Sequence, residues 1–256
     1  TSGAKQRIAS LGPEWFRGAR ELDRSRPPAA TDYSIIFSSS GSTGRPKLIE
    51  FGRKAVHYRV LGKASHSYYT DRQRFLSLSG ETTSTTFQDI LVTLIKAGMV
   101  IRPTDRKPAT ILDTIQLFRP DYCALAPGTL TQLLDEMDET STVIEKIGMV
   151  RVAGAYCPPP LQHAALGRIA NKLIITLGAT EISRVTWGFS TDVEKVDRSV
   201  GRIVDGVEVA AFDEHDRILP QGTEGEIRVK VPEGAAATYP GKDRPERQTF
   251  KNGWVV

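Results

Sequence analysis

One stretch of the sequence carries the residue types of a phosphate-binding loop. Residues 38–47 read Ser-Ser-Ser-Gly-Ser-Thr-Gly-Arg-Pro-Lys and follow the apolar run 33–37. Small residues let backbone N–H groups approach an anion, hydroxyls add donors, and Lys47 adds a positive charge. The Walker pattern fails because Lys47 lies between Pro46 and Leu48. A solvated linker or a hairpin loop is the alternative, although a linker rarely combines a preceding apolar strand with a Pro-Lys ending.

A second candidate follows the apolar run 173–176 and reads Leu-Gly-Ala-Thr-Glu over residues 177–181. We expect a glycine turn at the carboxyl end of a strand, where open α/β sheets bind ligands in a crevice. Such a turn would present Thr180 and Glu181 to the ligand. Threonine can donate to a phosphate oxygen, and glutamate can hold Mg²⁺. The alternative for Thr180 is a helix cap.

Together the two stretches resemble the adenylate-forming superfamily, which includes acyl- and aryl-CoA synthetases, adenylation domains of nonribosomal peptide synthetases, and luciferases. The resemblance implies that the first loop closes over the β- and γ-phosphates of ATP. Residues 177–181 match the family's Tyr-Gly-x-Thr-Glu motif, except that Leu177 replaces an aromatic ring that stacks on adenine. Gly154-Ala155 is similar to the segment that lies along the adenylate, and a tight strand-to-helix turn explains it nearly as well.

The resemblance therefore implies a set of site residues. The catalytic candidates are Lys47, Thr180 and Glu181, and Glu181 is also the candidate ligand of the metal ion. The candidates for nucleotide binding are Ser39, Ser40, Gly41, Ser42, Thr43, Gly44, Lys47, Gly154, Ala155, Leu177, Gly178, Ala179 and Thr180.

The elements that must position these residues alternate between short apolar runs and amphipathic stretches. We predict strands over 75–78, 98–101, 122–126, 147–153 and 173–176, and helices over 53–69, 87–96, 111–118, 130–137 and 158–170. Val56, Val60 and Leu61 are expected on one side of the first helix, and the second helix places Ile90, Leu91, Leu94 and Ile95 at helical spacing. Beyond residue 201, Val207, Val209 and Ala211 and then Ile227, Val229 and Val231 alternate with other residues, as in half-buried antiparallel strands.

This order predicts an α/β fold: a largely parallel sheet with flanking helices, followed by a small antiparallel β subdomain. We expect a leader or linker over residues 1–30, an α/β region over 31–200, and a truncated β subdomain over 201–256. The resemblance covers about residues 33–256. Relative to the family, the first part of the large domain, the ribose-binding Thr-Gly-Asp segment after Trp254 and the mobile C-terminal domain with its lysine are absent, so we expect a fragment.

Composition excludes several classes of function. The 256 residues are 39% hydrophobic and 25% charged, as in an ordinary globular protein, and the net charge of +4 is too diffuse to indicate a nucleic-acid partner. No segment has the apolar length of a membrane span or the core of a signal peptide, so we expect a cytoplasmic protein. Cys123 and Cys157 are expected to be buried thiols, and the four histidines to be surface or capping residues without metal-ligand spacing.

The resemblance implies a ligase that joins a carboxylic acid to AMP with ATP and Mg²⁺, releases pyrophosphate and passes the acyl group to CoA. An adenylation domain that loads the thiol of a carrier protein, or a nucleotide-binding module without catalysis, is the alternative. Ser84 stands where amino-acid-activating relatives have an aspartate, which argues against an α-amino acid substrate. The polar run 82–86 either lines an acyl pocket or forms an ordinary loop.

Overall fold

The structure is a computed structural model that describes residues 34–39, 47–79, 83–196, 199–232, 235–239, 250–251 and 253–255. By its contacts the chain divides into a segment that ends at Asp32 and a unit that begins at Tyr33. The helices and strands described here all belong to the second unit.

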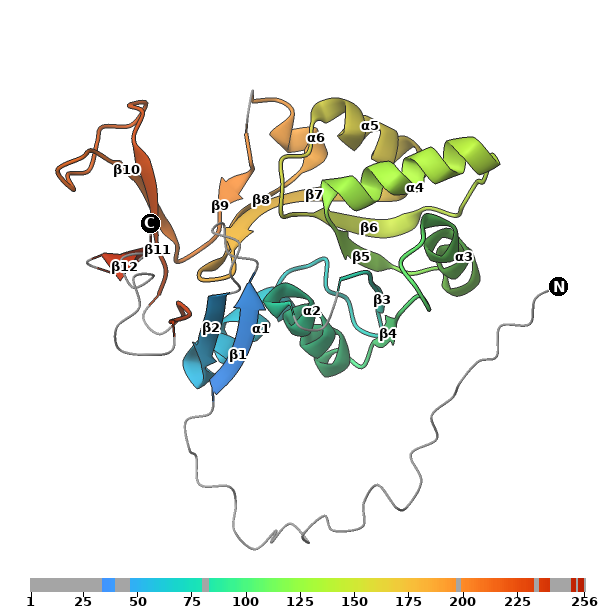
Figure 1. Cartoon of the computed structure of the whole chain (residues 1–256), viewed down its shortest axis with the longest axis horizontal. Coiled ribbons are helices and arrows are strands. Elements are labelled where there is room, and N and C mark those ends of the chain that lie inside the picture. Colours follow the sequence, from blue (N-terminus) through green and yellow to red (C-terminus); the bar gives the residue numbers. More distant parts are fainter. Residues whose placement is uncertain are drawn as a thin grey trace, which may run out of the picture. The chain divides into compact units, whose positions relative to one another are not determined.

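A seven-stranded sheet forms the centre of this unit (Figure 1). Its strands, in spatial order, are β4 (Met99–Ile101), β3 (Arg74–Ser77), β5 (Tyr122–Leu125), β6 (Ile147–Val152), β7 (Ala170–Ala179), β8 (Ser183–Phe189) and β9 (Arg202–Ile203). The five strands from β4 to β7 are parallel, and β8 and β9 continue the sheet in antiparallel pairing. The prediction of a largely parallel sheet is confirmed.

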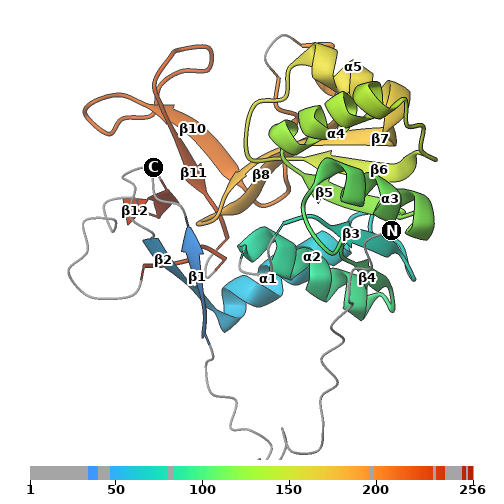
Figure 2. The same cartoon turned by 45° about the vertical axis from the view of Figure 1, so that its right-hand side comes forward.

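Helices cover both faces of this sheet, as Figures 1 and 2 show. The helices are α1 (Arg53–Ala64), α2 (Ser84–Ile95), α3 (Pro108–Phe118), α4 (Pro127–Thr140), α5 (Pro159–Arg168) and the short α6 (Ser190–Val193). Because successive side chains of a strand point to opposite faces, Tyr122 packs in the core beneath α1 and α2, and Cys123 packs in the core beneath α3, α4 and α5. Both cysteines are free and buried, as predicted.

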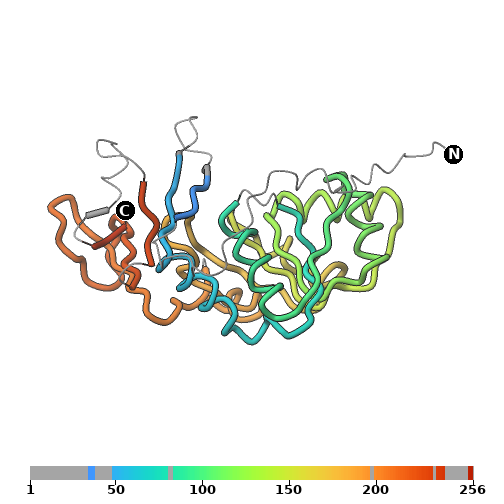
Figure 3. Tube along the Cα trace, turned by 90° about the horizontal axis from the view of Figure 1, so that it is seen from below, coloured from blue at the N-terminus to red at the C-terminus, as the bar shows by residue number. Residues whose placement is uncertain are grey.

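Two smaller β structures complete the unit. Strands β1 (Ser34–Ser39) and β2 (Lys47–Gly52) form an antiparallel hairpin. The strands β10 (Glu208–Phe212), β11 (Glu226–Lys230), β13 (Trp254–Val255) and β12 (Phe250–Lys251) form a four-stranded antiparallel sheet, in that order. In the view of Figure 3 this sheet lies at one end of the unit, with the hairpin beside it. The small antiparallel sheet after residue 201 is therefore confirmed.

The first two helices differ from their predicted bounds and faces. Helix α1 ends at Ala64 instead of residue 69, and Leu61 is 53% exposed although Val56 and Val60 are buried. Helix α2 begins earlier than predicted, at Ser84, and buries Asp89, Val92 and Thr93. Leu94 and Ile95 are 57% and 60% exposed. The face of α2 that packs against the core is instead the one that carries Asp89, whose carboxylate pairs with two buried cations.

The end of the sheet also differs from the prediction. The strand expected over 173–176 runs to Ala179, so Leu177, Gly178 and Ala179 lie in β7 and not in a glycine turn. Strands β8 and β9 and helix α6 were not predicted. Strand β7 is longer than predicted because it pairs with β8 over most of its length, and this tertiary contact extends it beyond its apolar run. Strand β9 still belongs to the large sheet, and the predicted division into domains stays a prediction.

Candidate functional site

The Ser/Gly stretch connects the two strands of the β1–β2 hairpin. Ser39 ends β1, Lys47 begins β2, and their backbones are paired. Residues 40–46, with the predicted phosphate ligands Ser40, Gly41, Ser42, Thr43 and Gly44, lie outside the described residues, so their predicted role stays a prediction. The pairing of β1 with β2 makes a hairpin, the arrangement named above as the alternative to a phosphate-binding loop.

The second motif lies in the β7–β8 hairpin. The register shifts between Leu177 and Gly178, which marks a bulge. A Cβ atom on Gly178 would lie 2.2 Å from the carbonyl oxygen of Ser183 and 2.9 Å from the Cα atom of Arg184. Gly178 is therefore needed because the partner strand approaches closely, and Thr180 and Glu181 occupy the turn that follows.

One cavity of about 310 Å³ brings two predicted segments together. Gly154, Ala155, Leu177 and Gly178 line it, with Ile175 and Thr176 on the β7 side. Gly154 has a positive φ of 93°, and no atom lies within 4 Å of the Cβ that another residue would carry there, so the glycine is explained by the tight turn. Leu177 is 48% exposed and offers an apolar surface to this cavity.

The turn at Thr180 and Glu181 is held by three residues from other segments. Arg59 of α1 donates from Nη1 to the carbonyl oxygen of Thr180 at 2.7 Å and from Nη2 to that of Glu181 at 2.5 Å. Tyr239 donates its hydroxyl to Oε1 of Glu181 at 2.6 Å. The backbone N–H of Ala237 donates to the Glu181 carbonyl at 2.8 Å. The orientation of the Glu181 carboxylate is therefore fixed by tertiary contacts.

Arg59 is almost completely buried, with 3% of its surface exposed. Its Nε donates to the carbonyl of Ala235 at 3.3 Å, and its guanidinium carbon lies 4.3 Å from the centre of the Phe51 ring. Burial lowers the pKa of Arg59 to about 9, and the negative charge of Glu181 opposes this shift. The guanidinium donates its N–H groups to backbone carbonyl oxygens and stacks on the Phe51 ring.

Glu181 fits the requirements of a magnesium ligand. Its Oε1 accepts from Tyr239, and within the described residues Oε2 accepts no hydrogen bond, so one oxygen is available to a cation. Mg²⁺ is usually bound through one or two carboxylates together with substrate phosphates. No cluster of three or more His, Cys, Asp or Glu that could hold a metal ion occurs in the described part of the chain, and such a phosphate-assisted site does not require one.

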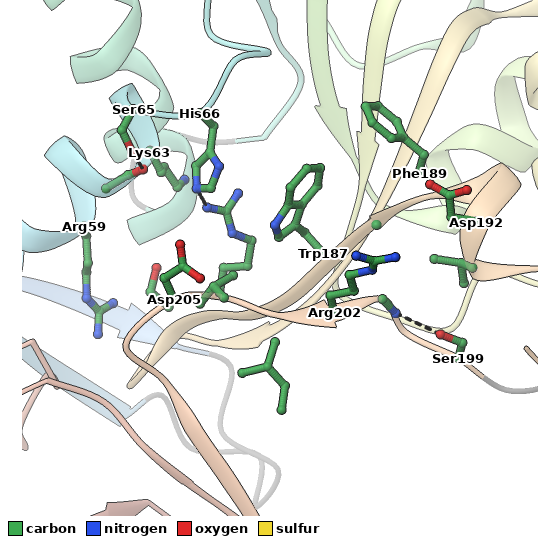
Figure 4. A pocket seen from close by; sticks show the side chains of 18 of the residues that line it. Arg59, Lys63, Ser65, His66, Trp187, Phe189, Asp192, Ser199, Arg202 and Asp205 are labelled. Atoms are coloured by element: carbon green, nitrogen blue, oxygen red, sulfur yellow. Dashed lines mark hydrogen bonds between the residues drawn. The ribbon is translucent and has the colours of Figure 1, made fainter.

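A larger cavity, of about 1230 Å³, lies between α1, β8 and the segment around β9, and Figure 4 shows side chains that line it. His66 contacts Arg184, stacks on Tyr68 and meets Trp187 edge-on. Burial, followed by the charge of Arg184, lowers the pKa of His66 to about 4. His66 is thus half-buried in an aromatic cluster, and its prediction as a surface or capping residue is wrong.

A buried ionic network lies between the first two helices and the sheet. Asp89 of α2 accepts from Lys63 of α1 at 2.8 Å and from Arg151 of β6 at 2.5 Å, and the Tyr69 hydroxyl donates to it at 2.5 Å. Burial lowers the pKa of Lys63 to about 7, which Asp89 opposes. Arg151 immediately precedes the end of β6, so the network connects the helix after the Ser/Gly stretch with the strand that leads to Gly154.

Sequence reasoning missed Arg59, Lys63 and Tyr239. A signal existed for the first two, because Arg59 and Lys63 follow Val56 and Val60 by three residues and so share the buried face of α1. No pattern in the sequence pointed to Tyr239, whose role depends on pairing between the distant residues Glu50 and Thr238.

Comparison with known proteins finds relatives among both peptide synthetases and CoA ligases. The chain is 26% identical over 208 residues to the nonribosomal peptide synthetase TES of Alternaria alternata, covering 80% of this chain and 4% of that protein. It is 31% identical over 165 residues to the medium/long-chain-fatty-acid–CoA ligase FadD8 of Mycobacterium tuberculosis, covering 64% of this chain and 29% of the relative. The chain thus spans less than a third of either relative.

A solved structure shares the fold. The O-succinylbenzoate coenzyme A synthetase MenE of Bacillus subtilis, in complex with ATP and a magnesium ion, has a TM-score of 0.73 at 19% identity, and the match covers 86% of this chain and 45% of that one. The family of AMP-binding enzymes matches residues 4–239, which includes most of the stretch that we expected to be a leader or linker. The chain therefore belongs to the family of AMP-binding enzymes.

Proposed function

We propose that this chain is the nucleotide-binding part of an enzyme that joins a carboxylic acid to AMP with release of pyrophosphate. The observation that carries the proposal is the 310 Å³ cavity, where Gly154-Ala155 meets Leu177-Gly178 beside the anchored turn of Thr180 and Glu181. Segments far apart in the sequence, each similar to a nucleotide-binding motif of the family, line this cavity or adjoin it.

In the proposed reaction a carboxylate oxygen of the acid attacks the α-phosphorus of ATP, and the bond to pyrophosphate breaks. Negative charge grows on the departing pyrophosphate, so the protein must neutralise it and hold the two reactants in line. We assign this task to the loop residues 39–44, Lys47 and Thr180, and the binding of Mg²⁺ to Glu181. Mg²⁺, when bound, offsets phosphate charge. The adenine would lie against Gly154, Ala155, Leu177, Gly178 and Ala179.

We further propose that the acyl group then passes to the thiol of CoA, which attacks the acyl carbon and releases AMP. The support is the likeness to a CoA ligase, 31% identical over 165 residues. The chain is also 26% identical over 208 residues to a peptide synthetase, so the identities alone do not separate the two acceptors. Full-length protein supplied with the acid and ATP should form an acyl-CoA. Transfer only to a phosphopantetheine-bearing carrier protein would favour the adenylation-domain alternative.

The experiment that tests the nucleotide site is calorimetry of ATP·Mg²⁺ binding to this chain. Lys47→Ala and Glu181→Gln should each weaken binding about 10-fold or more, because each removes a charged partner of the phosphates or the metal. Glu181→Gln should leave binding of ATP in EDTA unchanged, since its effect depends on the cation. Lys54→Ala, on the exposed side of α1, is the matched control for Lys47→Ala and should bind like the wild type.

Three results would contradict parts of this proposal. Absence of ATP·Mg²⁺ binding by the wild-type chain would remove the pre-formed site. Equal affinity of the Glu181→Gln variant would remove that residue from the metal role. Binding without any adenylate formation by the full-length protein would favour the nucleotide-binding module.

A further inference from the structure

We propose that Arg59 and Tyr239 are positioning residues that hold the Thr180–Glu181 turn and aim the Glu181 carboxylate. The inference rests on the proposed function for the role of Glu181 in binding Mg²⁺. The clamp itself is a property of the chain without ligand, because every contact that defines it lies between described residues.

The first half of the clamp is the guanidinium of Arg59. Its planar fork donates to two successive carbonyl groups of the turn, those of Thr180 and Glu181, and to the carbonyl of Ala235. Lysine presents a point charge and cannot reproduce this flat arrangement of donors. The stacking on Phe51 of β2 fixes the plane of the fork. Arg59 therefore sets where the backbone of the turn lies relative to the β1–β2 hairpin.

The second half is the hydroxyl of Tyr239, which acts on the side chain of Glu181. Its bond of 2.6 Å to Oε1 restricts rotation of the carboxylate and leaves Oε2 for a cation. Hydrogen bonds to charged groups are stronger than those between neutral groups. Tyr239 is 5% exposed, so water does not replace this donor readily.

Backbone contacts connect both halves to strand β2. Glu50 of β2 and Thr238 exchange two backbone hydrogen bonds, of 2.7 and 2.8 Å, and Ala237 donates to the carbonyl of Glu181. The segment 235–239 thus lies between the hairpin that carries Lys47 and the turn that carries Glu181. The clamp therefore connects strand β2, which begins at Lys47, with the turn that carries Glu181.

Arg59 is among the residues that line the larger cavity, but its hydrogen bonds go to the Thr180–Glu181 turn and to Ala235. In Figure 4 its side chain comes from α1 and points away from His66 and Trp187. Among the described residues no carboxylate forms an ion pair with Arg59 within 4 Å, and its hydrogen bonds all go to carbonyl groups. A residue needed only to neutralise charge would be placed against a carboxylate, so the arrangement favours a role in fixing backbone.

Hydrogen exchange without nucleotide tests the clamp independently of the proposed function. Amide exchange at residues 180–183 should be about 30-fold faster in Arg59→Ala, because two bonds to the turn are lost, and about 3-fold faster in Tyr239→Phe. Arg59→Lys, which keeps the charge, should resemble Arg59→Ala and serves if the alanine variant does not fold. Arg53→Ala and Tyr58→Phe, matched substitutions elsewhere on α1, should exchange like the wild type.

Binding of ATP then tests the aim of the carboxylate. Tyr239→Phe should weaken the binding of ATP·Mg²⁺ about 10-fold and leave the binding of ATP in EDTA unchanged. Arg59→Lys should weaken both kinds of binding. Unchanged exchange at residues 180–183 in both Arg59 variants would overturn the clamp. Normal Mg²⁺-dependent binding by Tyr239→Phe, where Glu181→Gln binds weakly, would overturn the role of Tyr239. If the wild type binds no ATP·Mg²⁺, the proposed function fails, and the exchange rates still decide the clamp.

Discussion

At the scale of single residues, His66 shows how surroundings change the chemistry of a side chain. Its ring lies 5.4 Å from the Tyr68 ring and 5.8 Å from that of Trp187, and the guanidinium of Arg184 contacts it. The charge of Asp205 opposes the lowering of the His66 pKa, and the charge of Lys63 lowers that pKa further. The neutral imidazole is the form that this cluster stabilises.

The depressed pKa predicts how stability changes with pH. The unfolded chain binds a proton at His66 near pH 6.5, and the folded chain only near pH 4, so the contribution of neutral His66 is complete above 6.5 and is lost as the pH falls from 6.5 to 4. His66→Gln cannot titrate, so its free energy of unfolding should fall less over this range. Urea unfolding at pH 7, 6, 5 and 4 measures the difference, and parallel curves for the two proteins would contradict the assignment.

At the scale of elements, the β7–β8 hairpin leaves no room for a side chain at Gly178. Gly178→Ala should destabilise the chain by roughly 1–3 kcal/mol, because the new methyl would overlap the backbone of Ser183 and Arg184. Thermal unfolding measures the loss.

Gly167 in α5 offers the matched control. No atom lies within 4 Å of the Cβ that alanine would add there, so Gly167→Ala should stabilise the helix, by at most about 1 kcal/mol. Equal effects of the two substitutions would show that the close approach of β8 to Gly178 does not limit that position.

At the scale of the whole unit, the ionic network at Asp89 joins α1, α2 and β6. Asp89→Ala should cost about 3–5 kcal/mol in the free energy of unfolding, because it leaves the buried cations of Lys63 and Arg151 without their partner. Urea denaturation followed by circular dichroism measures this loss.

The exposed pair of Arg168 and Asp138 is the control for the network. Nη1 of Arg168 lies 2.6 Å from Oδ1 of Asp138, and the side chains are 36% and 68% exposed, so Asp138→Ala should cost less than about 1 kcal/mol. Similar losses in the two variants would mean that the Asp89 network does not hold the two helices to the sheet.

In the described part of the chain, no helix has both the length and the apolar character to cross a membrane.

The sequence by itself determined the class of fold and most of the elements. Short apolar runs between amphipathic stretches suffice to predict a largely parallel sheet, because its buried strands must be apolar and its crossovers helical. The motifs at 38–47 and 177–181 are local strings, so the family resemblance could be read without knowing the fold.

Only the tertiary structure decided how these motifs are held. Gly178 lies in a strand because β8 approaches it, and Asp89 is buried because Lys63 and Arg151 meet it from two other elements. Tyr239 reaches Glu181 because residues 235–239 pair with β2. These contacts join residues far apart in the chain, and neither periodicity nor local spacing encodes which distant partners will meet.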